Sequence, residues 1–434
     1  MEHLLFVAYL VLFAWLVTRT RFFTRSGLSH SQLVILFLLK VMAGIFYGWM
    51  GKYYGDLAQM VDTWSFHQAG REEYKLLLTD PGAYISNLFY NPYPGGLDNF
   101  FGSYNSYWND LKGNIFVKLL SVFNIFSFGQ YYINVIFFSF ISLFGPMAVY
   151  RVMNDIFPGQ KMTILLASFL IPSFIYWTSG IHKEGLIFLA ISLIIYHLYF
   201  GYKDGRYHWK RWIAVIVSLL LLLLLRNFMM ALVIPAVIAW LLAARRQRHG
   251  LGIFLAVYAF CAILFFNGRH ISERFDFPKA VVDKQQAFLQ LQGGGSNIPI
   301  KKLEPDAVSF LKNVPQAVTL SLLRPYPGDV RDLLTLAACV EINLLLALFV
   351  LFLVFRRKNQ GHSGNIIYLF IFFSLSVMLA IGFSVNNLGA IVRYRSIIFP
   401  LLLVPMVALT DWKKIIAFLG QKNNRQPLSN DQLS

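Results

Sequence analysis

Residues 51–70 read GKYYGDLAQMVDTWSFHQAG, and they open a polar stretch that extends to residue 114. A segment dense in Tyr, Asn, Gly and Pro follows them, whereas long apolar runs flank the whole stretch. We therefore predict that residues 51–114 form a folded loop held by a frame of membrane helices. An aspartate of this loop, Asp62 or Asp56, is the residue that we expect to carry its chemistry.

The composition indicates a membrane protein. The chain of 434 residues is 57% hydrophobic and only 14% charged, and its mean hydropathy is +0.56. Soluble globular chains are about 45–50% apolar and about 25% charged. Repeated Leu-, Ile- and Phe-rich runs match the roughly 20 residues that cross a bilayer as a helix, and they lack the period-2 alternation of a membrane β-barrel. These features predict an all-α polytopic membrane protein.

The apolar runs predict about eleven transmembrane helices and two long external loops that contain interfacial helices. The chain then divides into an N-terminal transmembrane module (1–267) that includes the loop 51–114, a second external loop (268–332), C-terminal transmembrane helices (333–410) and a tail (411–434). The candidate spans are residues 4–17, 32–49, 130–150, 162–178, 185–200, 212–225, 228–243, 251–267, 333–355, 366–385 and 397–410.

The distribution of charge predicts the orientation of the chain. With the N-terminus outside, the short inside loops are rich in Lys and Arg, as in RTRFFTR (19–25), RRQRH (245–249) and RRK (356–358). This is the pattern of the positive-inside rule. We expect an integral protein of a bacterial plasma membrane with a cytoplasmic tail. The net charge of +17 then indicates anionic membrane lipids as general partners, and not nucleic acid.

The sequence names no certain cofactor. Cys261 and Cys339 lie inside apolar runs, and no CxxC, HExxH, Walker or GxGxxG pattern occurs. A divalent cation held by Asp56 and Asp62 stays open, because carboxylates are ligands for such ions.

Asp62 opens VDTWSFHQAGREEYKLLL (61–78), which predicts a short helix along the membrane interface. A carboxylate just outside a span is placed to accept a proton from an incoming hydroxyl, and we expect partial burial to raise its pKa toward neutral pH. Asp56 is the competing candidate, and simple N-capping of the helix is the alternative role for Asp62. His67 is a further candidate base, although such a histidine more often packs as a satisfied polar residue.

The stretch NLFYNPYPGGLDNFFGSYNSYWND (87–110) combines aromatic side chains with amides. Aromatic faces and amide groups suit a hydroxyl-rich ligand such as a sugar. We predict that Trp64, Tyr93, Tyr104 and Trp108 contact a sugar or an acceptor. The alternative stays open that Tyr and Trp gather here only because they favour membrane interfaces.

Segments far apart in the sequence place cations at the predicted outer ends of spans. Arginine matches phosphate geometry with a two-pronged guanidinium, and lysine adds a point charge. We predict a cradle for a phosphate or pyrophosphate headgroup, with snorkelling to the interface as the alternative. Glu184 and Glu341 are the expected ion-pair partners. The cradle residues are His182 and Lys183 in WTSGIHKEG, Arg226 in LLRNF, Arg324 in LLRPYPGD, and Arg393 and Arg395 in VRYRS.

This arrangement resembles the GT-C superfamily of integral-membrane glycosyltransferases, which use polyprenyl-phosphate-linked sugar donors. The resemblance depends on acidic residues early in the first external loop (Gly55-Asp56 and Val61-Asp62), on the interfacial helix that follows, and on late external arginines (RPYPGD and RYRS). It implies that Asp62, or else Asp56, activates the acceptor, and that the cationic residues hold the donor phosphate. The additional N-terminal span departs from the usual pattern of the family.

The resemblance implies inverting transfer of a sugar from a polyprenyl-linked donor to a glycan, lipid or protein acceptor on the outer face. A surface-polysaccharide polymerase or ligase is the first alternative, in which the arginines are central and Asp62 is incidental. The second alternative is a transporter or flippase for a lipid-linked anion. It requires broken helices or intramembrane polar groups that face a path.

Overall fold

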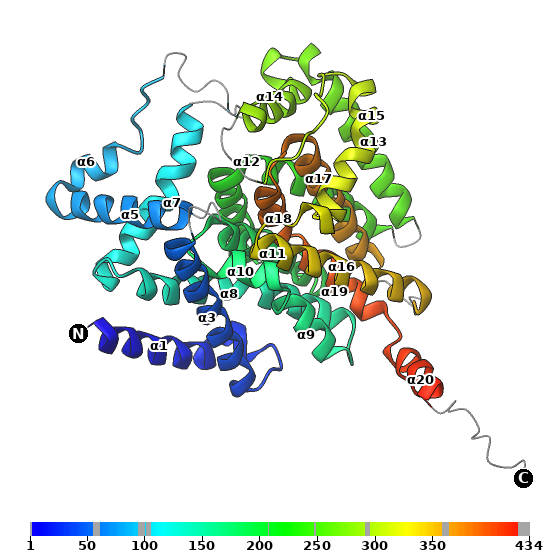
Figure 1. Ribbon diagram of the computed structural model, residues 1–434, viewed down its shortest axis with the longest axis horizontal. Coiled ribbons are helices and arrows are strands. Elements are labelled where there is room, and N and C mark those ends of the chain that lie inside the picture. The colour runs from blue at the N-terminus through cyan, green and yellow to red at the C-terminus, as the bar shows by residue number, and fades with distance from the viewer. Residues whose placement is uncertain are drawn as a thin grey trace, which may run out of the picture.

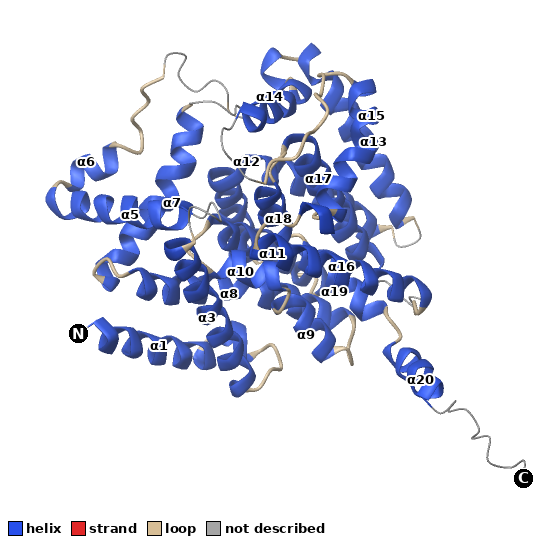
Figure 2. Cartoon of the chain, viewed as in Figure 1, coloured by secondary structure: helices blue, strands red, loops and turns tan. Residues whose placement is uncertain are grey.

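The computed structural model describes residues 2–54, 61–93, 100, 106–206, 208–246, 249–290, 296–357 and 364–423. Within these ranges every regular element is a helix (Figure 2), and the β contacts are two isolated bridges, Asn297 with Asn387 and Arg356 with Thr410. The predicted all-α class is therefore confirmed for the described part. Its long apolar helices suggest a membrane protein.

In the first half of the described chain, the helices α5–α7 separate α1–α3 from the long apolar helices that begin with α8. Its elements are α1 (Glu2–Arg19), α2 (Arg21–Thr24), α3 (His30–Tyr53), α5 (Val61–Thr79), α6 (Pro81–Ser86), α7 (Tyr107–Ser127), α8 (Tyr131–Ile156), α9 (Lys161–Phe169), α10 (Pro172–Ser179), α11 (Lys183–Lys203) and α12 (Trp209–Arg245).

The second half places short helices between α13 and α16. Its elements are α13 (Gly250–Asn267), the 3₁₀ turns η1 (Gly268–His270) and η2 (Glu273–Phe275), α14 (Phe277–Gln290), α15 (Ala307–Val318), the π-helical turn η3 (Thr319–Leu323), the 3₁₀ turn η4 (Pro327–Asp329), α16 (Leu333–Val354), α17 (Gly364–Ser384), α18 (Leu388–Ser396), α19 (Phe399–Leu409) and α20 (Trp412–Asn423). Figure 1 shows α5–α7 on one side and α13–α15 on another, with α10, α11, α12 and α18 between them.

Eight helices of the described chain are long and apolar enough to cross a bilayer, and two bent pairs raise this number to ten if each pair counts as one span. The pair α9–α10 bends by 54° and the pair α18–α19 by 56°. The predicted count of eleven differs because it treats α12 as two spans, 212–225 and 228–243.

Helix α12 turns back on itself at Arg226, whose φ of −160° and ψ of 83° are not helical. Tyr202, at the end of α11, donates to the carbonyl of Ala244 at 2.5 Å and contacts the ring of Trp240, and α12 begins shortly after Tyr202. Arg226 instead reaches Glu184 at the start of α11 (2.7 Å). Because α11 is about 30 Å long, both ends of α12 lie at one end of α11 and Arg226 lies at the other.

The central helices approach one another closely at glycines. Gly145 of α8 lies against α11, where an added Cβ would be 2.9 Å from the ring of Phe188 and 3.1 Å from Cα of Leu189. Gly44 of α3 lies against α10, and there a Cβ would be 2.5 Å from the carbonyl oxygen of Ser179. The contact at Gly44 fixes the end of α10, which leads directly into His182.

Replacing Gly44 by Ala tests the α3–α10 contact. The added methyl would overlap the Ser179 carbonyl and the Val135 side chain (2.6 Å), so we expect a loss of roughly 1–3 kcal/mol in the free energy of unfolding. Thermal unfolding in detergent measures it. Gly252 is the matched control, because a Cβ there meets nothing within 4 Å and alanine favours the helix. A Gly44→Ala protein as stable as the Gly252→Ala protein would contradict the packing.

Candidate functional site

A buried carboxylate, Glu184, forms the centre of the site. It lies in the first turn of α11 and has no exposed surface. One oxygen contacts Nδ1 of His182, and the other accepts from Nη2 of Arg226 at 2.7 Å and lies 3.8 Å from Nε of Arg393. A buried charge is costly unless it is paired and hydrogen-bonded, so the two guanidiniums and the His182 ring make the position of Glu184 possible.

Arg393 connects this buried centre to Asp62 in the first turn of α5. Its Nη1 donates to Oδ2 of Asp62 at 2.9 Å and lies 3.3 Å from Nε2 of His182. The Asp62 side chain is 50% exposed, whereas the Arg393 side chain is 19% exposed. The five residues Asp62, His182, Glu184, Arg226 and Arg393 form one continuous network, which we call the Glu184 cluster.

The contacts of His182 define what its ring can do. Its side chain is buried, and the rings of Tyr47 and Trp177 pack edge-on against it at 6.3 and 6.1 Å. In the neutral ring, Nδ1–H donates to Glu184 and Nε2 accepts from Arg393, because a guanidinium can only donate. In the protonated ring, Nε2–H is directed toward Asp62, whose Oδ2 lies 3.9 Å away. His182 therefore sits between the two carboxylates.

The pKa of Asp62 is lowered to about 2. The interaction with His182 makes the largest contribution, burial opposes it, and the positive charge of Arg393 adds to the lowering. The expectation that burial raises this pKa is therefore wrong in direction, since the ion pairs outweigh desolvation. Asp62 is ionised at neutral pH and engaged by Arg393.

Arg226 lies over an aromatic ring at the turn of α12. Its guanidinium is 4.3 Å from the ring centre of Tyr394. The guanidinium of Arg393 is 5.1 Å from the same ring centre. The adjacent Asn227 donates to the carbonyl of Phe100 at 2.5 Å, and Phe100 packs edge-on against Trp108 at the start of α7. The turn of α12 thus brings α7 next to the Glu184 cluster.

Three lysines lie near the cluster, and we call Lys112, Lys183 and Lys284 the lysine group. The pKa of Lys112 is lowered to about 8, first by burial and then by the charges of Lys284, Lys183 and Arg226. Burial also lowers the pKa of Lys284, and the charge of Arg226 adds to it. Sequence reasoning selected Lys183 alone, because Lys112 and Lys284 lie in polar segments without a membrane span to fix their depth.

Four of the six predicted cradle residues, His182, Lys183, Arg226 and Arg393, are brought together at this site. The other two have different contacts. Buried Arg395 donates to the backbone carbonyls of Ser321, at 3.1 Å, and of Arg324, and Arg324 pairs with Asp329 at 3.3 Å. These contacts hold the end of η3, and neither side chain contacts the Glu184 cluster within the described chain.

The α5 residues Trp64 and His67 face away from Asp62. The indole of Trp64 donates to the carbonyl of Gly48 at 2.8 Å and stacks on Tyr131 with ring centres 4.1 Å apart. His67 packs edge-on against the same two rings, at 5.8 and 5.3 Å. Both side chains therefore contribute to the packing that orients α5.

The remaining predicted residues lie in or near the aromatic stretch. The hydroxyl of Tyr93 donates to Oδ2 of Asp110 at 2.8 Å, and Trp108 packs against Phe100 as described above. Asp56 and Tyr104 lie outside the described residues. The sugar-binding role of this group stays a prediction.

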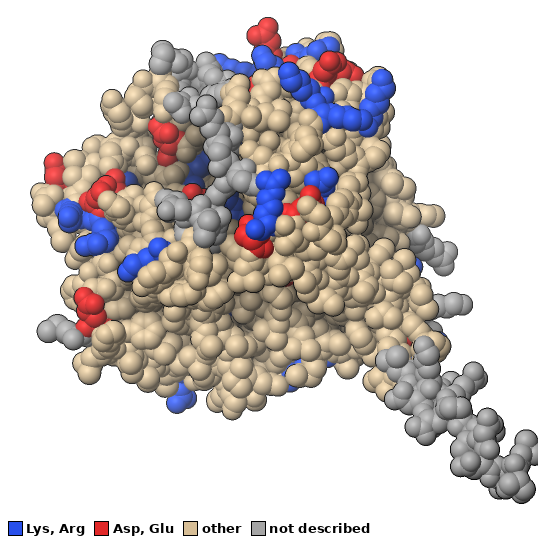
Figure 3. Space-filling model, viewed as in Figure 1, with Lys and Arg blue, Asp and Glu red and all other residues tan. Residues whose placement is uncertain are grey.

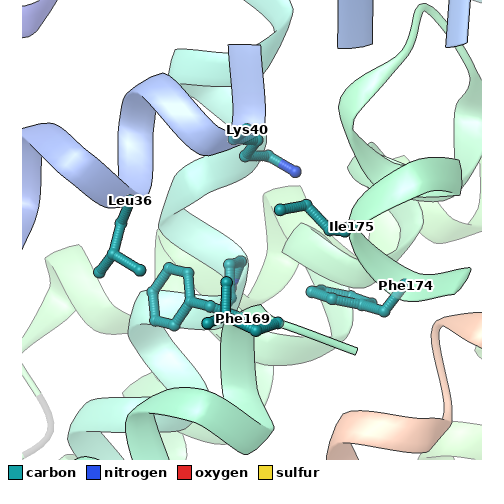
Figure 4. Close-up of a pocket in the computed structure, with 7 residues that line it drawn as sticks. Leu36, Lys40, Phe169, Phe174 and Ile175 are labelled. Carbon is teal, nitrogen blue, oxygen red and sulfur yellow. The ribbon is translucent and has the colours of Figure 1, made fainter. Parts of the chain in front are cut away.

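Two buried ionisable groups, Lys40 and Glu341, bind the two ends of α10, the helix that precedes His182. Lys40 of α3 donates to the Thr178 carbonyl at 2.8 Å and to the Ser179 hydroxyl at 3.2 Å, which stabilises the C-terminal end of α10. Figure 4 shows a small cavity that Lys40 lines together with Phe169, Phe174 and Ile175. Glu341 of α16 accepts from the backbone N–H of Ser173 at 2.6 Å and so caps the other end of α10. Its close partner in the described chain is thus a backbone N–H, and not the cation expected from the sequence.

Charged side chains gather unevenly on the face shown in Figure 3, where Lys and Arg atoms are visible within a hollow. Among the residues with described positions, no group of three or more His, Cys, Asp or Glu is arranged to hold a metal ion. No family model matches the chain, and no curated protein or solved structure matches it.

Replacing Glu184 by Gln tests the central role of this carboxylate. It leaves Arg226 and Arg393 without their buried partner, so we expect a loss of roughly 3–5 kcal/mol in the free energy of unfolding. Unfolding in detergent measures it. Asp155→Asn is the control, because the Asp155–Lys203 pair is exposed enough (26% and 51%) that its loss should cost less than about 1 kcal/mol. Equal losses of unfolding free energy in the two variants would contradict the central role of Glu184.

His67 should make stability depend on pH. Its pKa is lowered from 6.5 to about 4, by burial and then by the charge of Arg71. Between these two values the unfolded chain binds a proton that the folded chain does not, so stability falls as the pH drops from 6.5 toward 4. From pH 7 to 5 we expect a loss of ~2 kcal/mol, measured by chemical unfolding in detergent.

The variant His67→Gln should lack this part of the pH dependence. Replacing the exposed His270 by Gln serves as the control for the removal of a histidine as such. An unchanged pH profile in His67→Gln would show that His67 titrates at its ordinary value.

Proposed function

We propose that this chain is a membrane glycosyltransferase that moves a sugar from a polyprenyl-phosphate or polyprenyl-pyrophosphate donor to a hydroxyl of a glycan, lipid or protein acceptor. The contact between Arg393 and Asp62 carries the proposal. It joins a guanidinium, which matches phosphate geometry, to a half-exposed carboxylate that can accept a proton. The resemblance to the GT-C superfamily assigns the same two roles to these residues.

The donor phosphate would bind Arg393 together with Lys183 and Arg226. Arg226 and Arg393 are already paired with Glu184, so they are held in position before the donor arrives. Preorganised cations of this kind stabilise the charge that develops on a leaving phosphate. The polyprenyl tail would lie among the apolar helices, which keeps the sugar at the membrane surface.

Binding of phosphate would also change Asp62. A phosphate that takes Nη1 of Arg393 removes one of the interactions that hold the pKa of Asp62 low, and its negative charge raises that pKa further. Asp62 then accepts the proton of the acceptor hydroxyl while the oxygen of that hydroxyl bonds to the anomeric carbon of the donor sugar. The bond from that carbon to the phosphate oxygen breaks, and its electron pair leaves with the phosphate, which inverts the configuration.

The proposed function implies an orientation of the chain in the membrane. The N-terminus would lie outside a bacterial plasma membrane and the tail from residue 411 inside, so that α5 and the Glu184 cluster face outward. A divalent cation is not needed for the steps above. If one takes part, Asp62 and Asp56 are the residues to hold it.

Two observations favour the alternatives. The low pKa of Asp62 makes it a weak base in the resting state, which favours a polysaccharide polymerase or ligase that depends on the arginines. The bent pairs α9–α10 and α18–α19 favour a transporter or flippase of a lipid-linked anion, since such proteins use discontinuous helices at their binding sites.

Replacement of Asp62 by Asn tests the proposed base. We expect the transfer rate to fall by about 10²–10⁴, with binding of the donor retained because Arg393 loses only a competitor. Transfer from a polyprenyl-linked donor in purified membranes is the measurement. Glu72→Gln, which changes an exposed carboxylate on the same helix, is the matched control and should keep full activity. Asp56→Asn decides whether the second aspartate replaces Asp62 in this role.

The three functions give different results in this assay. Full activity in both aspartate variants, together with loss of activity in Arg393→Ala, would support the polymerase or ligase. Absence of transfer by the wild type, with movement of the lipid-linked anion across vesicles, would support the transporter.

A further inference from the structure

We infer that the site binds a diphosphate, with one phosphate at Arg393 and the second held by the lysine group, Lys112, Lys183 and Lys284. This inference rests on the proposed function, which leaves open whether the donor is a monophosphate or a diphosphate. It concerns two lysines, Lys112 and Lys284, that neither the motifs nor the ion-pair network include.

The balance of charge separates the two parts of the site. In the Glu184 cluster two carboxylates face two guanidiniums, so the cluster is compensated within the protein when His182 is neutral. Among the residues with described positions, no carboxylate forms an ion pair with a lysine of this group, although Glu184 and Asp62 attract Lys183 electrostatically. The positive charge of the group is therefore available to an anion, and a diphosphate carries one more acidic group than a monophosphate.

The contacts of Phe66 place two of the lysines on the Asp62 side of the cluster. The ammonium of Lys183 lies 5.2 Å from the ring centre of Phe66, which follows Asp62 by one turn of α5 and lies 6.3 Å from the ring of His182. Phe66 also packs edge-on against Phe116 of α7, at 5.2 Å. Lys112 precedes Phe116 by one turn and so lies on the same face of α7.

Lys284 of α14 is the third lysine of the group. Its ammonium lies 5.4 Å from the ring centre of Phe288, and it interacts electrostatically with Arg226, Tyr394 and Lys112. The lysine group therefore comes from three helices, α7, α11 and α14, and each of its lysines interacts electrostatically with Arg226. The repulsion that lowers the pKa of Lys112 has no compensating anion in the described chain.

The position of Lys183 adds to this argument. It is the first residue of α11, and the positive end of a helix dipole disfavours a cation there. The same helix end offers backbone N–H groups to an anion. An anion bound between Lys183 and Lys112 would relieve both the repulsion among the lysines and the unfavourable position of Lys183.

Binding of two short lipid phosphates to the purified full-length protein in detergent tests the inference. Farnesyl diphosphate and farnesyl monophosphate are titrated into the wild type, into the double variant Lys112→Gln/Lys284→Gln and into Lys279→Gln. The double variant leaves Lys183, Arg226 and Arg393 in place, and Lys279 is an exposed lysine on the same helix as Lys284. Thermal unfolding verifies that each variant is folded.

We expect the wild type and Lys279→Gln to bind the diphosphate at least about tenfold more tightly than the monophosphate. The double variant should lose most of this preference while its affinity for the monophosphate stays within about twofold of the wild type. Equal affinities of the wild type for both probes, or a preference that survives in the double variant, would overturn the inference and leave the proposed function intact.

Two further outcomes concern the donor itself. If the wild type binds neither farnesyl probe, the lipid-phosphate donor of the proposed function fails as well. Uridine diphosphate distinguishes the sources of a diphosphate. Binding as tight as that of farnesyl diphosphate, and equally dependent on Lys112 and Lys284, would support the diphosphate site and contradict a lipid-linked donor.

Discussion

The arrangement of the site depends on the burial of one negative charge. Glu184 has no exposed surface, so its carboxylate is tolerated only with cations and hydrogen-bond donors around it. Those partners come from the residues before α11, from the turn of α12 and from α18, and each of these segments must stop or bend where it does to reach Glu184. The requirement to compensate this charge therefore fixes the relative positions of helices that are far apart in the sequence.

Arg393 couples the buried centre to the accessible edge of the site. A single nitrogen, Nη1, faces both Asp62 and His182, and the guanidinium also lies near Glu184. Any anion that binds this nitrogen must displace Asp62 or His182, so binding of the anion and release of a proton acceptor are the same event. Of these partners Asp62 is the most exposed. Displacing Asp62 therefore leaves a carboxylate unpaired that water can still solvate, which costs less than leaving a buried group unpaired.

The all-helical class and the position of most spans are predictable from the sequence, because apolar runs of membrane length are a local property of the chain. The meeting of His182, Lys183, Arg226 and Arg393 also follows from local patterns, since each lies at the same predicted end of a span. The lowered pKa of Asp62 does not follow, because it depends on the distances in space to His182 and then to Arg393. Arg395 likewise pairs with backbone carbonyls that only the folded chain brings together.

The placement of compensated and uncompensated charge separates folding from binding. The most completely buried charges have partners within the described chain: Glu184 is ion-paired, and Lys40 and Arg395 donate to backbone carbonyls. The lysine group is less buried than Glu184, and Lys284 is exposed, so solvent weakens the repulsion among the lysines without removing it. Within the described part of the chain, a ligand can therefore gain affinity from the lysines without breaking an ion pair, whereas its contact with Arg393 requires an exchange. This arrangement confines the coupling between binding and chemistry to a single guanidinium.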